Sequence, residues 1–289
     1  MPTKIEKDAV TGTDTTGHEW DGIKELNTPL PKWWLYILYA TVIWGVGYMI
    51  AYPAWPGLRS HTDGLLGYNS RADLAETMAM HEKRRAPRLD RIRAASLEDI
   101  RGNADLLRFA IAGGRVAFAE NCAGCHGAGG AGAKGFPNLA DDDWLWGGTL
   151  AEIQATIQHG VRTGDDKARA SQMPRFGADG LLKPGEIADL AEYVLALSGQ
   201  AHDADAAKRA QGGYADQCAS CHGDKGQGNR EVGAPRLDDR IWLYGGDRAA
   251  IARSIAEARG GVMPGWTERL DAATLKMLAV YVHALGGGL

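Results

Sequence analysis

The pattern of hydrophobic and polar positions separates one apolar run from a long region of helical periodicity. The 20 residues from Trp33 to Tyr52 carry no charge. As a helix this run would be about 30 Å long, the thickness of the hydrocarbon core of a bilayer. Tryptophan and tyrosine gather at both of its ends, as they do at membrane interfaces. The pattern predicts a transmembrane helix over residues 33–52.

Two other interpretations of the run are a buried core helix and a cleaved signal peptide. The run is longer than the ~7–15 apolar residues of a signal peptide, and a polar segment, residues 1–32, precedes it. Pro53 and Pro56 end the helix where a signal peptide would have a small-residue cleavage site. We therefore expect an uncleaved, single-pass anchor. Lysine and arginine are balanced on its two sides, so charge alone does not orient it.

Apolar residues recur at helical spacing in two later stretches that resemble each other. Ile153 and Ile157 are four residues apart, as are Ile251 and Ile255. Two further helical stripes follow, Leu190, Val194 and Leu197 in one, and Leu278, Val282 and Leu285 in the other. Strand-like alternation is not convincing anywhere, so the predicted class is all-α. For the charged segment over residues 53–103 we expect short helices packed on a partner.

All four cysteines fall into two motifs of the same form. Each pair is separated by two residues and followed directly by histidine: Cys122, Cys125 and His126, then Cys218, Cys221 and His222. This spacing is the attachment signature of haem c, in which both thiols bond to the porphyrin and the histidine lies beneath the iron. A four-cysteine zinc site would not need the histidines, and a thioredoxin-like dithiol would need a βαβ context. We predict two covalently bound haem c groups.

The sequence after each motif repeats in the same order. The matching residues are Pro137 and Pro235, Leu139 and Leu237, Trp144 and Trp242, Met173 and Met263, and Tyr193 and Tyr281. This order resembles the class I cytochrome c fold, present twice. We expect one such domain over residues 104–200 and a second over 201–289. Gly114 and Ala210, each followed four residues later by an aromatic, predict a close helix crossing against Tyr193 or Tyr281.

The resemblance to class I cytochromes implies which residues complete the iron coordination. It assigns Met173 and Met263, each directly before a proline, as the distal ligands opposite His126 and His222. Which methionine faces which histidine stays open, because the ligands could cross between the domains. We also expect the carbonyls of Pro137 and Pro235 to accept a hydrogen bond from the Nδ1–H of the two histidines. No catalytic residue is predicted.

The remaining histidines and methionines lack this symmetry. His159, His202 and His283 have no counterpart in the other copy and are expected at the surface or in packing. Met277 is expected to pack on its helix, and Met78 and Met80 to lie on a helix surface or contact a partner. Trp144 and Trp242 fit a haem-lining role and simple core packing equally well.

Composition narrows the possible partners. A net charge of −4 argues against a nucleic-acid-binding protein, which carries a basic excess. Residues 106–200 carry −3 and residues 201–289 carry zero, which suggests an acidic face that steers a basic cytochrome donor. The 39 glycines fit short helices and tight turns wrapped around a flat group.

The N-terminal third makes the resemblance more specific. The run His18–Asn27 precedes Pro31–Trp34 and the apolar helix, and Tyr52–Pro56 follows it. With two haem c domains, the chain resembles the dihaem subunit III (the CcoP/FixP type) of cbb(3)-type cytochrome c oxidases over essentially its full length. Some relatives have two membrane helices, whereas this chain has one. The resemblance implies a non-catalytic subunit that passes electrons from the cytochrome bc complex or soluble cytochrome c to monohaem and haem-copper subunits.

Covalent haem attachment occurs outside the bacterial cytoplasm, which gives the orientation that charge does not. We expect residues 1–32 in the cytoplasm, one span of the inner membrane, and both haem domains in the periplasm. Two alternatives stay open. One is a free-standing membrane-anchored dihaem carrier, or the cytochrome subunit of a periplasmic dehydrogenase. The other is a dihaem peroxidase, which needs a five-coordinate iron and is disfavoured by the presence of both Met173 and Met263.

Overall fold

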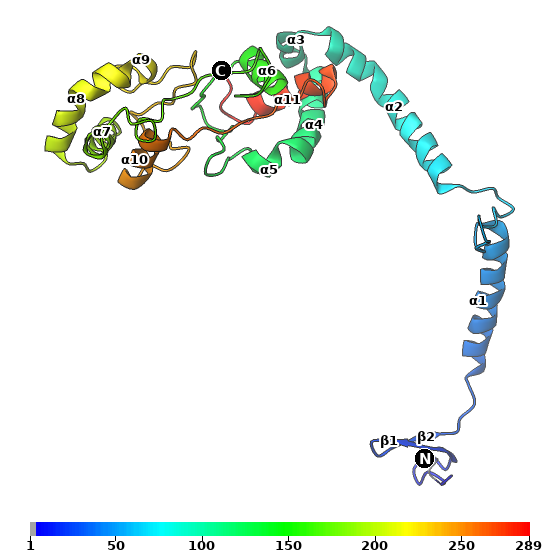
Figure 1. Cartoon of the computed structure of the whole chain (residues 1–289). Helices are drawn as coiled ribbons and strands as arrows, with labels where there is room; N and C mark the ends of the chain where they lie inside the picture. Colours follow the sequence, from blue (N-terminus) through cyan, green and yellow to red (C-terminus); the bar gives the residue numbers. More distant parts are fainter. Residues whose placement is uncertain (1–3) are drawn as a thin grey trace. The chain divides into compact units, whose positions relative to one another are not determined.

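The computed structural model describes residues 4–289. The chain forms two compact units, one ending at Glu82 and the other beginning at Lys83 (Figure 1). The first unit holds a β-hairpin and the apolar helix. The second holds both cysteine motifs. The division falls inside helix α2 (Ser70–Ala94).

The first unit begins with an antiparallel hairpin of β1 (Thr15–Trp20) and β2 (Ile23–Leu26). The expectation of no strand is wrong here, although the chain as a whole is helical as predicted. Asp21 and Gly22 form the turn with φ angles of 50° and 85°. A two-residue Asp-Gly loop with both φ angles positive matches the twist of paired strands. The Asp-Gly dipeptide is the feature of the sequence that indicates this hairpin. The strands themselves are too short and too exposed to show a clear alternation of apolar and polar residues.

Helix α1 (Lys32–Ala51) agrees with the predicted span to within one residue at each end. Among residues 4–289, it is the one helix long and apolar enough to cross a membrane. None of its side chains is buried, so its whole surface is available to lipid. At its C-terminal end the rings of Tyr48 and Tyr52 stack with centroids 4.6 Å apart, and Tyr68 meets Tyr52 edge-on at 5.6 Å. These tyrosines form an aromatic cluster at one end of the apolar stretch.

Helix α2 replaces the short helices expected between the anchor and the first motif. It runs for 25 residues because the segment is rich in Ala, Glu, Lys, Arg and Met, which favour helix. Met78 and Met80 are exposed on it, as predicted. Its C-terminal end is capped by Lys276, whose Nζ donates to the carbonyls of Ile92, Arg93 and Ala95 at 3.3, 2.8 and 2.6 Å. The short helix α3 (Leu97–Gly102) follows.

Within residues 104–289 each sequence repeat forms four helices in the same order. The first repeat gives α4 (Ala104–Asn121), α5 (Ala123–His126), α6 (Leu150–His159) and α7 (Pro184–Leu197). The second gives α8 (Ala204–Gln217), α9 (Ala219–His222), α10 (Arg248–Glu257) and α11 (Ala272–His283). The predicted helical stripes fall inside these helices, except Leu285, which lies in the turn two residues after α11.

The two hydrophobic cores exchange their C-terminal helices. Helix α11 of the second repeat packs on α4 and α6 of the first, whereas α7 of the first repeat packs on α8 and α10 of the second (Figure 1). We call residues 97–169 with 260–289 the Cys122 lobe, and residues 170–259 the Cys218 lobe. The sequence repeats, 104–200 and 201–289, therefore differ from the packed lobes. The Cys218 lobe is a continuous stretch of chain, inserted within the Cys122 lobe.

The predicted close helix crossing occurs in both lobes. In the Cys122 lobe, a Cβ atom on Gly114 would lie 2.6 Å from the Cβ of Tyr281, so only glycine fits there. The Phe118 and Tyr281 rings lie 5.4 Å apart. In the Cys218 lobe, the rings of Tyr214 and Tyr193 lie 4.8 Å apart. Each aromatic pair therefore joins residues of different repeats.

Two candidate haem sites

The first cysteine motif lies at the end of helix α4. Cys122 caps that helix, and its backbone N–H donates to the Phe118 carbonyl at 2.8 Å. The single turn of α5 then carries Cys125 and His126. Cys122 is half-buried and Cys125 is exposed. Burial raises the pKa of the Cys122 thiol to about 11. The two thiols thus face different surroundings, one toward the core and one toward solvent.

His126 is buried, with 9% of its surface exposed. Its Nδ1 lies 3.0 Å from the Pro137 carbonyl oxygen, which confirms the hydrogen bond predicted from the sequence. Since a carbonyl only accepts, the bond places a proton on Nδ1, and in the neutral ring Nε2 then keeps its lone pair. The chain after the motif reverses at Gly127, where φ is +78°, and the Gly132 N–H donates to the His126 carbonyl at 2.7 Å. The loop that carries Pro137 is thereby held against the histidine.

The second motif repeats this geometry on α8 and α9. His222 is also 9% exposed, and its Nδ1 lies 2.9 Å from the Pro235 carbonyl oxygen. Burial lowers the pKa of His222, which favours the neutral imidazole that a metal needs. Burial raises the pKa of the Cys218 thiol to about 11, while Cys221 is exposed. The two sites are therefore equivalent in their donors, burial and hydrogen bonds.

The structure separates the two predicted distal methionines between the lobes. Met263 packs against the core of the Cys122 lobe, as do Cys122 and Trp144. Met173 packs against the core of the Cys218 lobe, as do Cys218 and Trp242. Both methionines are partly buried. Each lobe therefore brings together two cysteines, a buried histidine and one methionine from the other repeat.

These residues fit a covalently attached haem. Within residues 4–289, neither His126 nor His222 uses its Nε2 in a hydrogen bond, so this nitrogen is available to a metal in both lobes. The motif cysteines provide one half-buried and one exposed thiol, as a flat group with one edge at the surface requires. Apolar side chains of the surrounding helices supply the rest of the wall.

The other candidate residues take structural positions. The Nδ1 of His159 pairs with Asp165 at 2.7 Å, that of His202 bonds to the Gln200 carbonyl at 2.8 Å, and the Nε2 of His283 bonds to the Leu289 carbonyl at 2.9 Å. These local contacts confirm the packing or surface role expected for all three. Met277 is 6% exposed in the core, as predicted.

Sequence reasoning missed several polar groups outside the two motifs. Arg162 donates from Nε to the Gly261 carbonyl at 2.7 Å and from Nη1 to the Ser171 carbonyl at 3.1 Å. Arg259 lies over the Tyr244 ring, 4.8 Å from its centroid. Asp143 is half-buried in the groove between the lobes, and burial followed by repulsion from Asp239 raises its pKa. Single arginines in loops carry no pattern that would have revealed these roles.

Comparison with known proteins assigns these features to a family. Three family models match in sequence order: the N-terminal domain of cytochrome oxidase-cbb3, FixP, at residues 12–59; cytochrome c at residues 111–198; and cytochrome C oxidase, cbb3-type, subunit III, at residues 205–282. These matches confirm the resemblance inferred from the N-terminal run and the two motifs.

Full-length relatives agree with the models. The chain is 55% identical to the cbb3-type cytochrome c oxidase subunit FixP of Bradyrhizobium sp. (strain ORS 278), over 100% of both chains. It is 55% identical to the FixP of Azorhizobium caulinodans, over 97% of this chain and 96% of that one. It is 54% identical to the CcoP of Azospirillum brasilense, over 98% of each. The haem interpretation of the motifs is thus favoured over zinc or a dithiol. The chain belongs to the FixP/CcoP family of cbb3-type cytochrome c oxidase subunits, and it carries two covalently bound c-type haems.

Proposed function

We propose that this chain relays electrons from the cytochrome bc complex or a soluble cytochrome c to the monohaem and haem-copper subunits of a cbb3-type oxidase. The main support for this proposal is the presence of two equivalent Cys-x-x-Cys-His sites. In each site the histidine is buried and hydrogen-bonded to a proline carbonyl. Its relatives are subunits of such oxidases, so other oxidase subunits are its partners. The chain itself is a carrier in aerobic and microaerobic respiration.

In this proposal the side chains of both sites hold the haems without offering a place for substrate. Cys122, Cys125, Cys218 and Cys221 form the covalent attachments, and His126, His222, Met173 and Met263 are the axial ligands. A bound c-type haem supplies one-electron redox chemistry, and a His/Met pair raises its potential. The proline carbonyls fix the histidine rings and direct Nε2 toward the iron. Filled coordination positions favour electron transfer over peroxide chemistry.

The orientation follows from where haem is attached. We propose that residues 1–32 are cytoplasmic, that α1 crosses the inner membrane once, and that both lobes are periplasmic. The exposed apolar surface of α1 would contact lipid and the membrane helices of partner subunits.

Both lobes are acidic, which supports steering of a basic donor. Residues 97–169 with 260–289 hold 9 basic and 12 acidic side chains, a formal charge of −3. Residues 170–259 hold 11 basic and 13 acidic side chains, a formal charge of −2. Because the helices are exchanged, the two lobes differ less in formal charge than the two sequence repeats do. Electrostatic attraction would therefore act on both lobes rather than on the first alone.

Purification of the chain from its native membrane in mild detergent tests this function. We expect it to co-elute with haem-copper and monohaem subunits, with two covalent haems per chain by haemochrome assay. A chain that elutes alone, or with a dehydrogenase, would support the free-standing carrier or the dehydrogenase subunit instead. Loss of the far-red methionine–iron band from one native oxidised haem would favour a peroxidase.

A further inference from the structure

We propose that Trp146 and Tyr244 are positioning residues that clamp the two lobes together and set the separation across which an electron passes between the haems. This proposal rests on the relay function above, and it adds which residues keep the two haem sites at a fixed separation. Passage between the lobes moves one electron, oxidising one iron and reducing the other, and no bond forms or breaks. Positioning the reactive atoms is the protein's part in such a step, because the tunnelling rate falls steeply with distance.

The two aromatic residues come from equivalent positions of the repeats. Each stands two residues after a tryptophan that packs against the core of its own lobe. The next residues, Gly147 and Gly245, have φ angles of +95° and +106°, which residues with a side chain rarely adopt. The chain therefore turns sharply directly after each ring, and both rings are presented in the same way.

Each ring packs on a glycine of the other lobe. A Cβ atom on Gly233, in the Cys218 lobe, would lie 2.3 Å from the Trp146 ring, so a larger residue there would displace the ring or push the lobes apart. A Cβ atom on Gly135, in the Cys122 lobe, would lie 3.4 Å from the Tyr244 ring. The Gly135 N–H also donates to the Leu243 carbonyl at 2.8 Å, which is a backbone bond between the lobes. The two glycines occupy equivalent positions of the repeats, so the contact is reciprocal.

Both glycines lie on the loops that orient the motif histidines. Each stands two residues before the proline whose carbonyl accepts the hydrogen bond from His126 or His222. In the second loop the backbones of Asn229 and Ala234 bond in both directions, at 2.9 and 3.0 Å, and the first loop has a similar pairing. A ring of one lobe therefore touches the braced loop that holds the histidine of the other.

An arginine lies over each ring where the chain crosses between the lobes. Arg169 ends the first part of the Cys122 lobe, and its guanidinium lies 5.9 Å from the centroid of the Trp146 ring. Arg259 ends the Cys218 lobe and lies 4.8 Å from the centroid of the Tyr244 ring. Its Nη2 also donates to the Ser254 hydroxyl at 2.7 Å, which anchors it to α10. Since an aromatic face attracts a cation, both crossings are held against the two rings.

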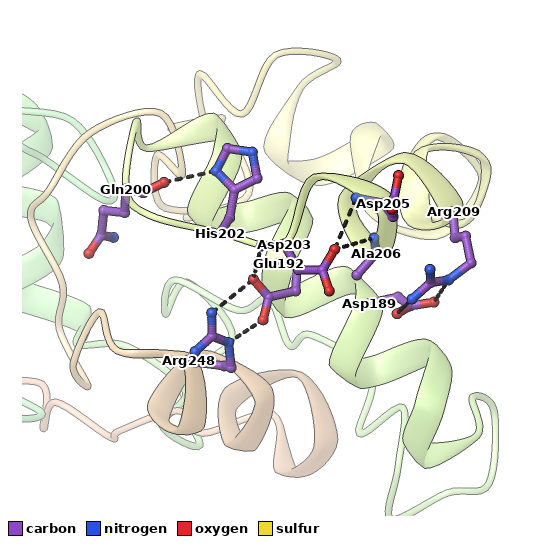
Figure 2. Close-up of polar contacts among 9 residues, drawn as sticks. All are labelled: Asp189, Glu192, Gln200, His202, Asp203, Asp205, Ala206, Arg209 and Arg248. Atoms are coloured by element: carbon purple, nitrogen blue, oxygen red, sulfur yellow. Dashed lines mark hydrogen bonds and ion pairs between the residues drawn. The ribbon is translucent and has the colours of Figure 1, made fainter.

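Contacts inside a lobe hold its helices to one another, so the freedom that is left is motion between the lobes. In the Cys218 lobe, Asp189 of α7 accepts from Arg209 of α8, and Glu192 of α7 accepts from Arg248 of α10 (Figure 2). Glu192 is 7% exposed and also accepts from the Asp203 N–H at the start of α8. The helices around this haem site are thus tied together. The reciprocal ring contacts then fix the placement of this lobe against the other.

Glycine variants of the full-length dihaem chain test the clamp. Gly233→Ala adds a methyl group where the Trp146 ring lies, whereas Gly180→Ala, the matched control in the same lobe, meets nothing within 4 Å. Their φ angles are +61° and +69°, so the backbone strain is alike. Dipolar EPR of the oxidised chain measures the iron–iron distance, and pulse radiolysis measures the rate of transfer between the haems. We expect Gly233→Ala to lengthen or broaden the distance and slow transfer several-fold, with Gly180→Ala unchanged. Equal distances and rates in both variants would overturn the proposal.

Ring variants separate this role from a general effect on folding. Trp146→Tyr and Tyr244→Trp each introduce the residue of the equivalent position, and both should keep the distance and the rate. Trp146→Ala combined with Tyr244→Ala should broaden the distance distribution, while the midpoint potentials and the far-red methionine–iron bands stay unchanged. Altered potentials with an unchanged distance would assign the rings to the haem sites themselves and would refute the clamp.

A measurement on the unmodified chain covers the case in which the variants do not fold. Amide hydrogen exchange, followed by NMR, compares the Gly135 N–H, bonded across the lobes, with the Gly132 N–H, bonded at 2.7 Å inside the Cys122 lobe. We expect similar protection of the two amides. Exchange at Gly135 that is far faster than at Gly132 would show that the lobes part, and the clamp would be wrong. Failure of the relay function would instead appear as elution without oxidase subunits, which leaves this comparison unaffected.

Discussion

The ion pair between Glu192 and Arg248 offers a test of helix exchange that does not involve the haems. Glu192 is buried on α7, whereas the Arg248 side chain on α10 is 60% exposed. The arginine donates from Nε and from Nη2, the latter at 3.1 Å, and the Asp203 N–H donates at 2.8 Å. The perturbation is a double-mutant cycle of Glu192→Gln, Arg248→Gln and the pair together.

The expected magnitude follows from this geometry. A hydrogen bond to a charged group contributes about 1.5–3 kcal/mol. Water competes for the exposed arginine, so we place the cost of Glu192→Gln at about 1–2 kcal/mol and the coupling energy at about 1 kcal/mol. Urea unfolding followed by tryptophan fluorescence at pH 7 measures the free energies for the four proteins. Arg253→Gln with Glu257→Gln, an exposed pair within α10 at 2.8 Å, is the matched control. Additive effects of Glu192→Gln and Arg248→Gln would refute the contact, and with it the placement of α7.

The same pair predicts a pH dependence. The hydrogen bond from Arg248 is the main reason that the pKa of Glu192 is lowered from its ordinary value of 4.5. A carboxyl whose pKa is lower in the folded chain stabilises it above the unfolded value, and that stabilisation is lost as pH falls through the folded one. The coupling energy should therefore be full at pH 7 and decline below about pH 4.5, and a coupling that does not change with pH would contradict this explanation.

Three further outcomes follow from the packing and charge. Gly114→Ala should destabilise the chain by about 1–3 kcal/mol in urea unfolding, because the added methyl meets α11; Gly212→Ala, which meets nothing within 4 Å, should stabilise it by up to about 1 kcal/mol, and equal effects would argue against the crossing. Lys276→Met should cost about 1–2 kcal/mol in the same assay, since it removes the donor to three carbonyls at the end of α2, and an unchanged urea midpoint would count against this cap. Electron delivery by a basic cytochrome in stopped-flow should slow as ionic strength rises, and a rate independent of salt would exclude steering by the acidic lobes.

Local patterns in the sequence were enough to predict most of the chain. The uncharged run gave α1, the helical stripes gave the haem-lobe helices, and the spacing of cysteine and histidine gave both haem attachments. The bonds from His126 and His222 to Pro137 and Pro235 followed from the repeat. Two segments were harder: the hairpin at Asp21-Gly22 lacked a strand pattern, and α2 continues through Pro87, a residue that favours a break in the helix. Contacts between distant loops had no local signal.

The helix exchange could not be predicted from such local patterns. At the helix crossings the two repeats carry equivalent residues, so α7 and α11 would each fit against either α4 or α8. Tyr193 and Tyr281 are interchangeable against the aromatic residues of α4 and α8. The residues that favour the exchange stand at positions where the two repeats differ in sequence. Glu192 corresponds to Val280, and Arg248 corresponds to Leu150. Without the exchange, Glu192 would lie against Leu150 and Arg248 against Val280, which would leave a buried carboxylate without its partner.

A second pair of positions at which the repeats differ, on another face of α7, also favours the exchange. Asp189 corresponds to Met277, and Arg209 corresponds to Gly113. In the exchanged lobes aspartate meets arginine, and the Met277 sulfur lies 2.6 Å from where a Cβ on Gly113 would stand, so glycine makes room for it. Sequential pairing would place aspartate opposite glycine and methionine opposite arginine. Of the two carboxylates, Glu192 is the buried one, and leaving it unpaired would cost several kcal/mol, far more than the difference between two apolar contacts. The positions at which the repeats differ thus determine which helix each lobe accepts.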